Sequence, residues 1–152
     1  MTGVLLKGDE LEVARAEVAA VRAAVGEGDY ADLLDVLDGV LASGSELDAR
    51  QADELDRLLT LALQSGRVRA LYGPGGEQAA LRAFRKLPTG AELAQSSAAV
   101  NDALASLAGR AIERLSLTPV GPGAFTLAVA TDGPQLSIRL DRQGARVASV
   151  EA

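Results

Sequence analysis

The sequence predicts an α+β protein, in which about five N-terminal helices are followed by a C-terminal four-stranded antiparallel meander. Two observations carry this prediction. Up to Gly109 the apolar residues recur every three or four positions, as on one face of a helix, and beyond it they alternate with polar residues, as in strands. Strands joined by such short turns leave no room for crossover helices and must pair antiparallel. We therefore expect a single domain over residues 1–152, with a helical part over 1–110 and a sheet over 111–152.

Five segments of the helical part have the apolar spacing of a helix, and most are followed by a glycine or a proline, which end helices. These segments cover residues 9–25, 30–41, 48–65, 77–86 and 93–111. We expect the third to be the most buried, because Leu61 and Leu63 extend its apolar stripe most of the way round. The stretch 67–72 is interpreted as a short strand or an irregular connector, and Gly73–Gly76 as a loop.

The fifth expected helix has the most regular apolar stripe in the chain. Thr89 and Glu92 form a capping box ahead of it, with Thr89 at the N-cap. The stripe is shorter than three heptads, which favours packing against the chain's own sheet over a helix–helix dimer seam.

The sheet part consists of four alternating runs separated by turn residues. The turns fall at 121–123, 131–134 and 141–144, where glycine, proline and aspartate gather. In such a meander one face is apolar and packs on the helices, while the other is solvated. The residues that we expect to face the helices from the two central strands are Leu127, Val129, Ile138 and Leu140.

The composition removes most catalytic chemistry, because the chain contains no histidine and no cysteine. Serine–histidine and cysteine–histidine relays, thiolate and imidazole metal sites and disulfides therefore cannot form within one copy. We expect no cofactor and no metal. The first residues carry no secretory signal, and no apolar run approaches the ~18 residues of a membrane span. These features predict a cytoplasmic protein without membrane contact.

Charge is divided along the chain, whose overall net charge is −6. Acidic residues dominate 1–56, whereas basic residues outnumber acidic ones over 57–152. We interpret these segments as two solvated surfaces that partly neutralise each other on folding. The alternative is a bipolar molecule whose ends attract different partners, or each other between copies. An acidic ridge on the second helix is interpreted as a solvated face, because it lacks the spacing of a calcium loop. Its members are Asp29, Asp32, Asp35 and Asp38.

The most localised signal is a group of bases that flank a glycine-rich turn. Backbone N–H groups at the turn and the neighbouring arginine forks suit an anion such as phosphate. The pattern is neither a nucleotide P-loop nor a dinucleotide fingerprint, and the bland alternative is a tight connector. The residues of this candidate anion site are Arg67, Arg69, Arg82, Arg85, Lys86, Gly75 and Gly76.

Three functions remain open at the level of the sequence. The first is a small non-enzymatic module that binds another protein or itself, which would expose a contiguous apolar patch. The second is an anion- or nucleic-acid-binding module that uses the arginines between 67 and 86, whose affinity would fall steeply with salt. The third, ranked below these, is a carboxylate-based enzyme, which would need a pocket with converging acids.

Overall fold

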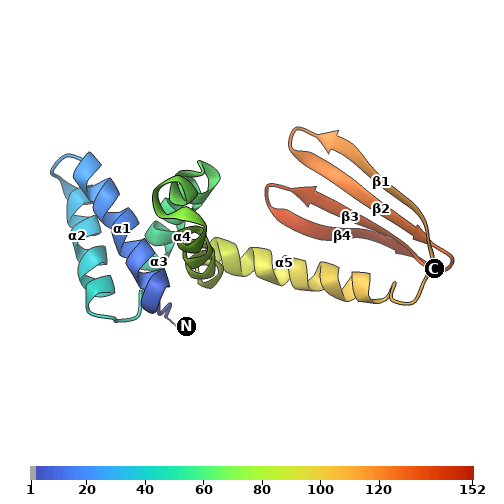
Figure 1. The fold of residues 1–152 in the computed structure, drawn as a ribbon, viewed down its shortest axis with the longest axis horizontal. Helices are drawn as coiled ribbons and strands as arrows, with labels where there is room; N and C mark the ends of the chain where they lie inside the picture. Colours follow the sequence, from blue (N-terminus) through green and yellow to red (C-terminus); the bar gives the residue numbers. More distant parts are fainter. Residues whose placement is uncertain (1–2) are drawn as a thin grey trace. The chain divides into compact units, whose positions relative to one another are not determined.

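The computed structural model describes residues 3–152 and confirms the α+β fold class, with five helices followed by one four-stranded sheet (Figure 1). None of the helices within this range is long and apolar enough to cross a membrane. The helices are α1 (Gly8–Ala24), α2 (Asp29–Ala42), α3 (Ala49–Gln64), α4 (Arg67–Lys86) and α5 (Pro88–Ala105). The strands are β1 (Ile112–Gly121), β2 (Ala124–Thr131), β3 (Gln135–Asp141) and β4 (Gly144–Glu151).

The chain divides into two compact units, the first ending at Ala91 and the second beginning at Glu92. The boundary falls inside α5, so the first turn of this helix belongs to the helical unit and the remainder belongs to the sheet unit. Each unit has its own apolar core.

The core of the helical unit is built from leucines of α2 and α3 packed against α1 and α4. Leu34, Leu37, Leu55 and Leu59 are fully buried together with Val18. Their spacing of three or four residues places them on one face of each helix, which explains why the apolar periodicity locates these helices correctly.

The helix α4 differs from the sequence prediction. Residues 67–72 are helical, and Gly73–Gly76 is not a loop, because only Gly73 leaves the helical conformation, at φ 70° and ψ −175°. Glycine adopts this positive φ without steric cost, and Pro74 then suits the first turn of the helical stretch that follows. The glycine-rich sequence thus produces a kink between two helical segments.

The start of α5 also differs from the prediction. The helix begins at Pro88, so Thr89 lies in its first turn and is not the N-cap. The cap is supplied from α3: Asp56 Oδ2 accepts hydrogen bonds from the Thr89 backbone N–H at 2.9 Å and from the Thr89 hydroxyl at 2.7 Å. The carboxylate thus satisfies a backbone donor that no helical carbonyl can reach.

The helix α3 contributes six buried residues, more than α1, α2 or α4 does. Its apolar surface does not run all the way round, since Leu61 is 60% exposed.

We expect Leu59→Ala, which empties a fully buried position, to lower the free energy of unfolding by about 2–5 kcal/mol. Leu61→Ala is the matched control and should change it by less than about 0.5 kcal/mol. Urea denaturation measures both, and equal effects would contradict this assignment of the two faces.

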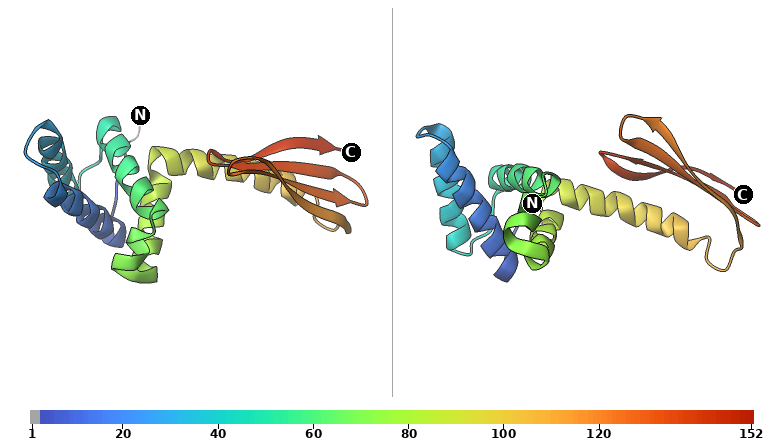
Figure 2. Two further views of the ribbon diagram at one scale, coloured as in Figure 1. Left: turned by 90° about the horizontal axis from the view of Figure 1, so that it is seen from above. Right: turned by 45° about the horizontal axis from the view of Figure 1, so that its top comes forward.

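The sheet follows the order β1-β2-β3-β4, with every neighbouring pair antiparallel. Its core consists of Val129, Leu136 and Ile138 packed under Val100 of α5, and Leu127 and Leu140 border this cluster. Figure 2 shows the C-terminal part of α5 running along one face of the sheet. The predicted orientation of the central strands is therefore confirmed, as is packing of the α5 stripe on the sheet.

The prediction fails for the first strand. All ten residues of β1 are exposed, although Leu115 and Leu117 alternate with polar residues as in a half-buried strand. The covering layer is a single helix about 10 Å wide, whereas four strands spaced at about 4.8 Å span a wider surface. One helix therefore leaves part of the sheet face uncovered.

Candidate functional site

The bases between Arg67 and Lys86 are distributed along α4, and most of them contact acidic residues. Lys86 Nζ lies 2.7 Å from Glu10 of α1, and Arg82 lies 3.8 Å from Asp9. Arg67 pairs with the buried Glu17, also of α1. The basic α4 thus packs against the acidic α1, which agrees with mutual neutralisation of the two charged segments.

The remaining members of the predicted anion site make weaker contacts with acidic residues or none. Arg69 lies 3.9 Å from Glu77 on the far side of the kink, whereas Arg85 makes no ion pair within residues 3–152. Gly75 has open space around its Cα, but a Cβ at Gly76 would lie 2.2 Å from the Cβ of Tyr72. Gly76 therefore serves close packing inside α4. Of these two arginines, only Arg69 thus has a carboxylate within ion-pair distance among the described residues.

The acidic ridge of α2 finds partners in the same way. Asp35 accepts a hydrogen bond of 2.9 Å from Arg22 of α1, and Asp38 accepts one of 3.0 Å from Arg15. Pairs with this exposure contribute little to stability. Their geometry shows that Asp35 and Asp38 lie beside α1, whereas Asp29 and Asp32 line a pocket together with Arg50 of α3.

A buried polar cluster joins α1 to the first segment of α4. Glu17 is 1% exposed and accepts hydrogen bonds from Arg67 and from the hydroxyl of Tyr72, the latter at 3.0 Å. Sequence reasoning missed Glu17. The signal that could have revealed it is its place three residues after Ala14 and beside Val18, where an acid stands on the apolar stripe of α1.

A second cluster joins α2 to α3. The Tyr30 hydroxyl donates to Glu54 at 2.7 Å, and Arg57 donates to the same carboxylate at 2.6 Å while its guanidinium lies 5.6 Å from the centre of the Tyr30 ring. Both tyrosines of the chain are thus partly buried and donate to a carboxylate. Burial, and to a smaller extent the hydrogen bond to Glu54, raises the pKa of Tyr30. Burial and the hydrogen bond to Glu17 raise the pKa of Tyr72 in the same way.

These shifts predict a pH dependence at the alkaline end. The pKa of each tyrosine in the folded chain lies above the ordinary value of 10.0. Each tyrosine therefore contributes to the free energy of unfolding in full below pH 10.0, and this contribution is lost as the pH rises through the folded pKa. We expect an ultraviolet absorbance titration to show that both tyrosines ionise at a higher pH in the folded chain than in the chain unfolded by urea. Coincident curves would contradict the hydrogen-bonded clusters.

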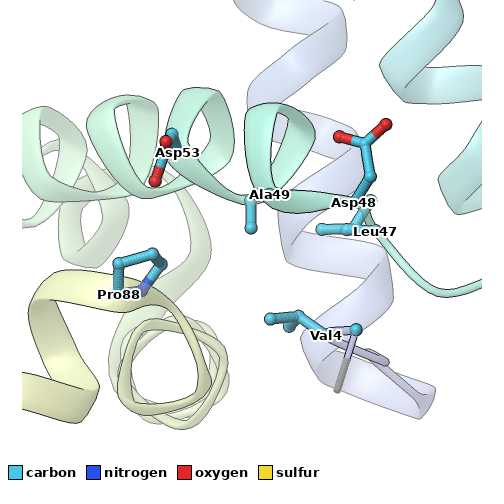
Figure 3. Close-up of a pocket in the computed structure, with 8 residues that line it drawn as sticks. Val4, Leu47, Asp48, Ala49, Asp53 and Pro88 are labelled. Atoms are coloured by element: carbon cyan, nitrogen blue, oxygen red, sulfur yellow. The ribbon is translucent and has the colours of Figure 1, made fainter. Parts of the chain in front are cut away.

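The helical unit contains a pocket of about 530 Å³ beside the first turn of α3 (Figure 3). Val4, Leu47, Ala49 and Pro88 give it an apolar wall, while the Asp48 carboxylate points away from Val4 and Pro88. Asp48 Oδ1 accepts the Gln51 backbone N–H at 2.8 Å, so this acid caps α3. Asp53 also lines this pocket, but with Asp48 turned away the two acids do not converge as the carboxylate pair of a glycosidase does.

A neighbouring pocket of about 450 Å³ is lined by two acids, Asp53 and Asp56. Asp56 is only 7% exposed, and its Oδ2 accepts a hydrogen bond from Thr89. Its Oδ1 is buried and has no hydrogen-bond partner among the described residues. Asp53 is exposed. Because Asp56 is occupied at the N-terminus of α5, this pair resembles a structural cap more than an acid–base couple.

The sheet unit leaves a row of apolar side chains on β1 exposed to solvent. Directly opposite residues of an antiparallel pair share a face, and the register places Leu115 opposite Val129 and Leu117 opposite Leu127. Leu115 and Leu117 thus lie on the same face as the sheet core, yet each is 59% exposed. Phe125, beside them on β2, is 40% exposed.

The other edge of the sheet is covered over the first part of its strand, whereas Val150 near the end of β4 is 59% exposed. Ala145 and Val147 of β4 are partly buried against the sheet core, and Arg146 is held by Asp141 at 2.7 Å. The contrast makes β1 the candidate functional site of the sheet unit. Sequence reasoning missed it, although Pro119 within the strand is a recognised sign of a sheet edge.

The sequence matches no family model, and neither a curated protein nor a solved structure resembles it significantly.

Proposed function

We propose that this chain is a non-enzymatic protein-interaction module that binds its partner through β1. The observation that carries the proposal is the row formed by Leu115 and Leu117, which extends the apolar face of the sheet beyond its covering helix. Exposed apolar surface that adjoins a core marks a binding surface in soluble proteins, and an uncovered edge strand offers backbone donors and acceptors in addition.

Two further observations favour this function over its alternatives. The arginines of α4 that would hold an anion are mostly engaged with carboxylates, which weakens the case for phosphate or nucleic acid. The buried acid beside the second pocket caps a helix, which weakens the case for an enzyme. The absence of cysteine suits a reducing compartment, and we place the protein in the cytoplasm.

The proposal is tested by capture from the native host with the full chain as bait. Leu115→Asp combined with Leu117→Asp should abolish capture of proteins that the unmodified chain retains, because two charges would have to be buried at the interface. Both side chains are exposed, so the circular dichroism spectrum should not change. Leu61→Asp, at an exposed leucine of the helical unit, is the matched control and should retain the same proteins. An unchanged set of captured proteins in the double variant would overturn the proposal.

A further inference from the structure

We infer that the partner is a second copy of this chain, bound by antiparallel pairing of β1 with its own symmetry mate about a twofold axis at Ser116. This inference rests on the proposed function and names the occupant of the surface. Three features of β1 support it: the length of its unpaired edge, the register irregularities and the proline that restrict pairing at its two ends, and the self-complementarity of its central residues.

The free edge of β1 is long but restricted at both ends. Within residues 3–152 this ten-residue strand pairs with β2 alone, so one side of its backbone has no partner strand there. Register irregularities occur between Ile112 and Arg114 and between Pro119 and Gly121. Bulges and proline are the usual means by which a sheet edge is blocked. The central stretch from Arg114 to Thr118 is left open for pairing.

This central stretch is complementary to itself when it is reversed. With the axis at Ser116, Leu115 lies opposite Leu117 of the other copy, and Arg114 lies opposite Thr118. Apolar side chains then meet on the face of the sheet core, and no like charges oppose each other. A contact of this kind is isologous, because the same residues serve both copies.

Other registers fit less well. An axis at Leu115 would place Glu113 opposite Leu117, and an axis at Leu117 would place Leu115 opposite Pro119. A shift by one residue would turn the leucines of one copy to the solvated face of the other. The twofold at Ser116 is therefore the register that brings Leu115 of each copy into contact with Leu117 of the other.

The absence of cysteine from the chain permits a direct test of this register. In Ser116→Cys the two introduced thiols would face each other across the axis, with Cα atoms about 4.5–5.5 Å apart in an antiparallel pair. This separation lies within the range of about 4.4–6.8 Å that a disulfide spans. We expect mild oxidation of the full-length variant to give a covalent dimer that a reducing agent reverses.

The sheet itself supplies a matched control. Ser116, Ala128, Ser137 and Ser149 are opposite one another in successive strands, so Ser149 occupies the same row and face at the other edge of the sheet. Ser149 is also exposed. Under identical oxidation Ser149→Cys should remain predominantly monomeric, because the inferred contact does not involve β4.

A second measurement reports the dimer without chemical modification. Light scattering on the unmodified chain should give twice the mass of one chain as the concentration rises, and Leu115→Asp with Leu117→Asp should raise the dissociation constant at least about tenfold. A chain that stays monomeric at every concentration would overturn the inference, while the capture experiment would still decide the proposed function. A dimer that crosslinks through Ser149, or not through Ser116, would overturn the assignment to β1 at this register.

Discussion

Ile138→Asp is expected to unfold the sheet unit while the helical unit stays folded. Ile138 is 2% exposed and packs with Val100, Val129 and Leu136, the other buried members of the apolar core cluster of this unit. A carboxylate at this position has no cation or hydrogen-bond donor in the cluster, and an unpaired buried charge costs more than a small core can offset. The division of the chain into two compact units predicts that the loss stays local.

Hydrogen exchange resolved along the sequence measures this outcome. Amides of β2 and β3 should lose their protection in the variant, whereas those of α2 and α3 should keep theirs. Leu117→Asp is the control, because the register places Leu117 in the same row as Ile138 but the side chain is 59% exposed. Retained protection in Ile138→Asp would show that this face is not the packed one, and loss of protection in Leu117→Asp would show that β1 is covered.

The comparison of Ile138 with Leu117 shows how far alternation predicts a sheet. A period of two identifies which residues share a face, and it placed Ile138 correctly. It does not reveal how much of that face the next layer covers, because coverage depends on the width of α5 relative to four strands. Leu117 follows the same pattern and is exposed for this reason. The candidate site on β1 is the part of the sheet where the sequence alternates as in a half-buried strand but α5 does not cover the apolar face.

The basic segment shows a different limit of sequence reasoning. Arg67 and Arg82 are close to other bases along the chain, which suggested a shared anion site. In the folded unit each of them meets an acid of α1, Glu17 and Asp9 respectively, far away in the sequence. Periodicity locates the helices, but it does not specify which faces of α1 and α4 meet. The partners of the arginines therefore could not be read from local charge density.

The pairing of Arg67 with Glu17 leads to a second large expected effect. We expect Arg67→Met to lower the free energy of unfolding by about 3 kcal/mol, because it leaves Glu17 buried with the Tyr72 hydroxyl as its remaining donor. This value is the lower end of the range for breaking a buried pair, since the Arg67 side chain is itself 41% exposed and partly screened by solvent.

Urea denaturation distinguishes this role from that of an ordinary surface charge. Arg82→Met removes an ion pair in which both side chains are about half exposed or more, and it should cost no more than about 1 kcal/mol. Adding Glu17→Leu to Arg67→Met should recover most of the lost stability, because apolar side chains of similar volume can replace a buried pair at little cost. If Arg67→Met were no more harmful than Arg82→Met, or if the double variant were weaker than the single one, Glu17 would not depend on Arg67 for its burial.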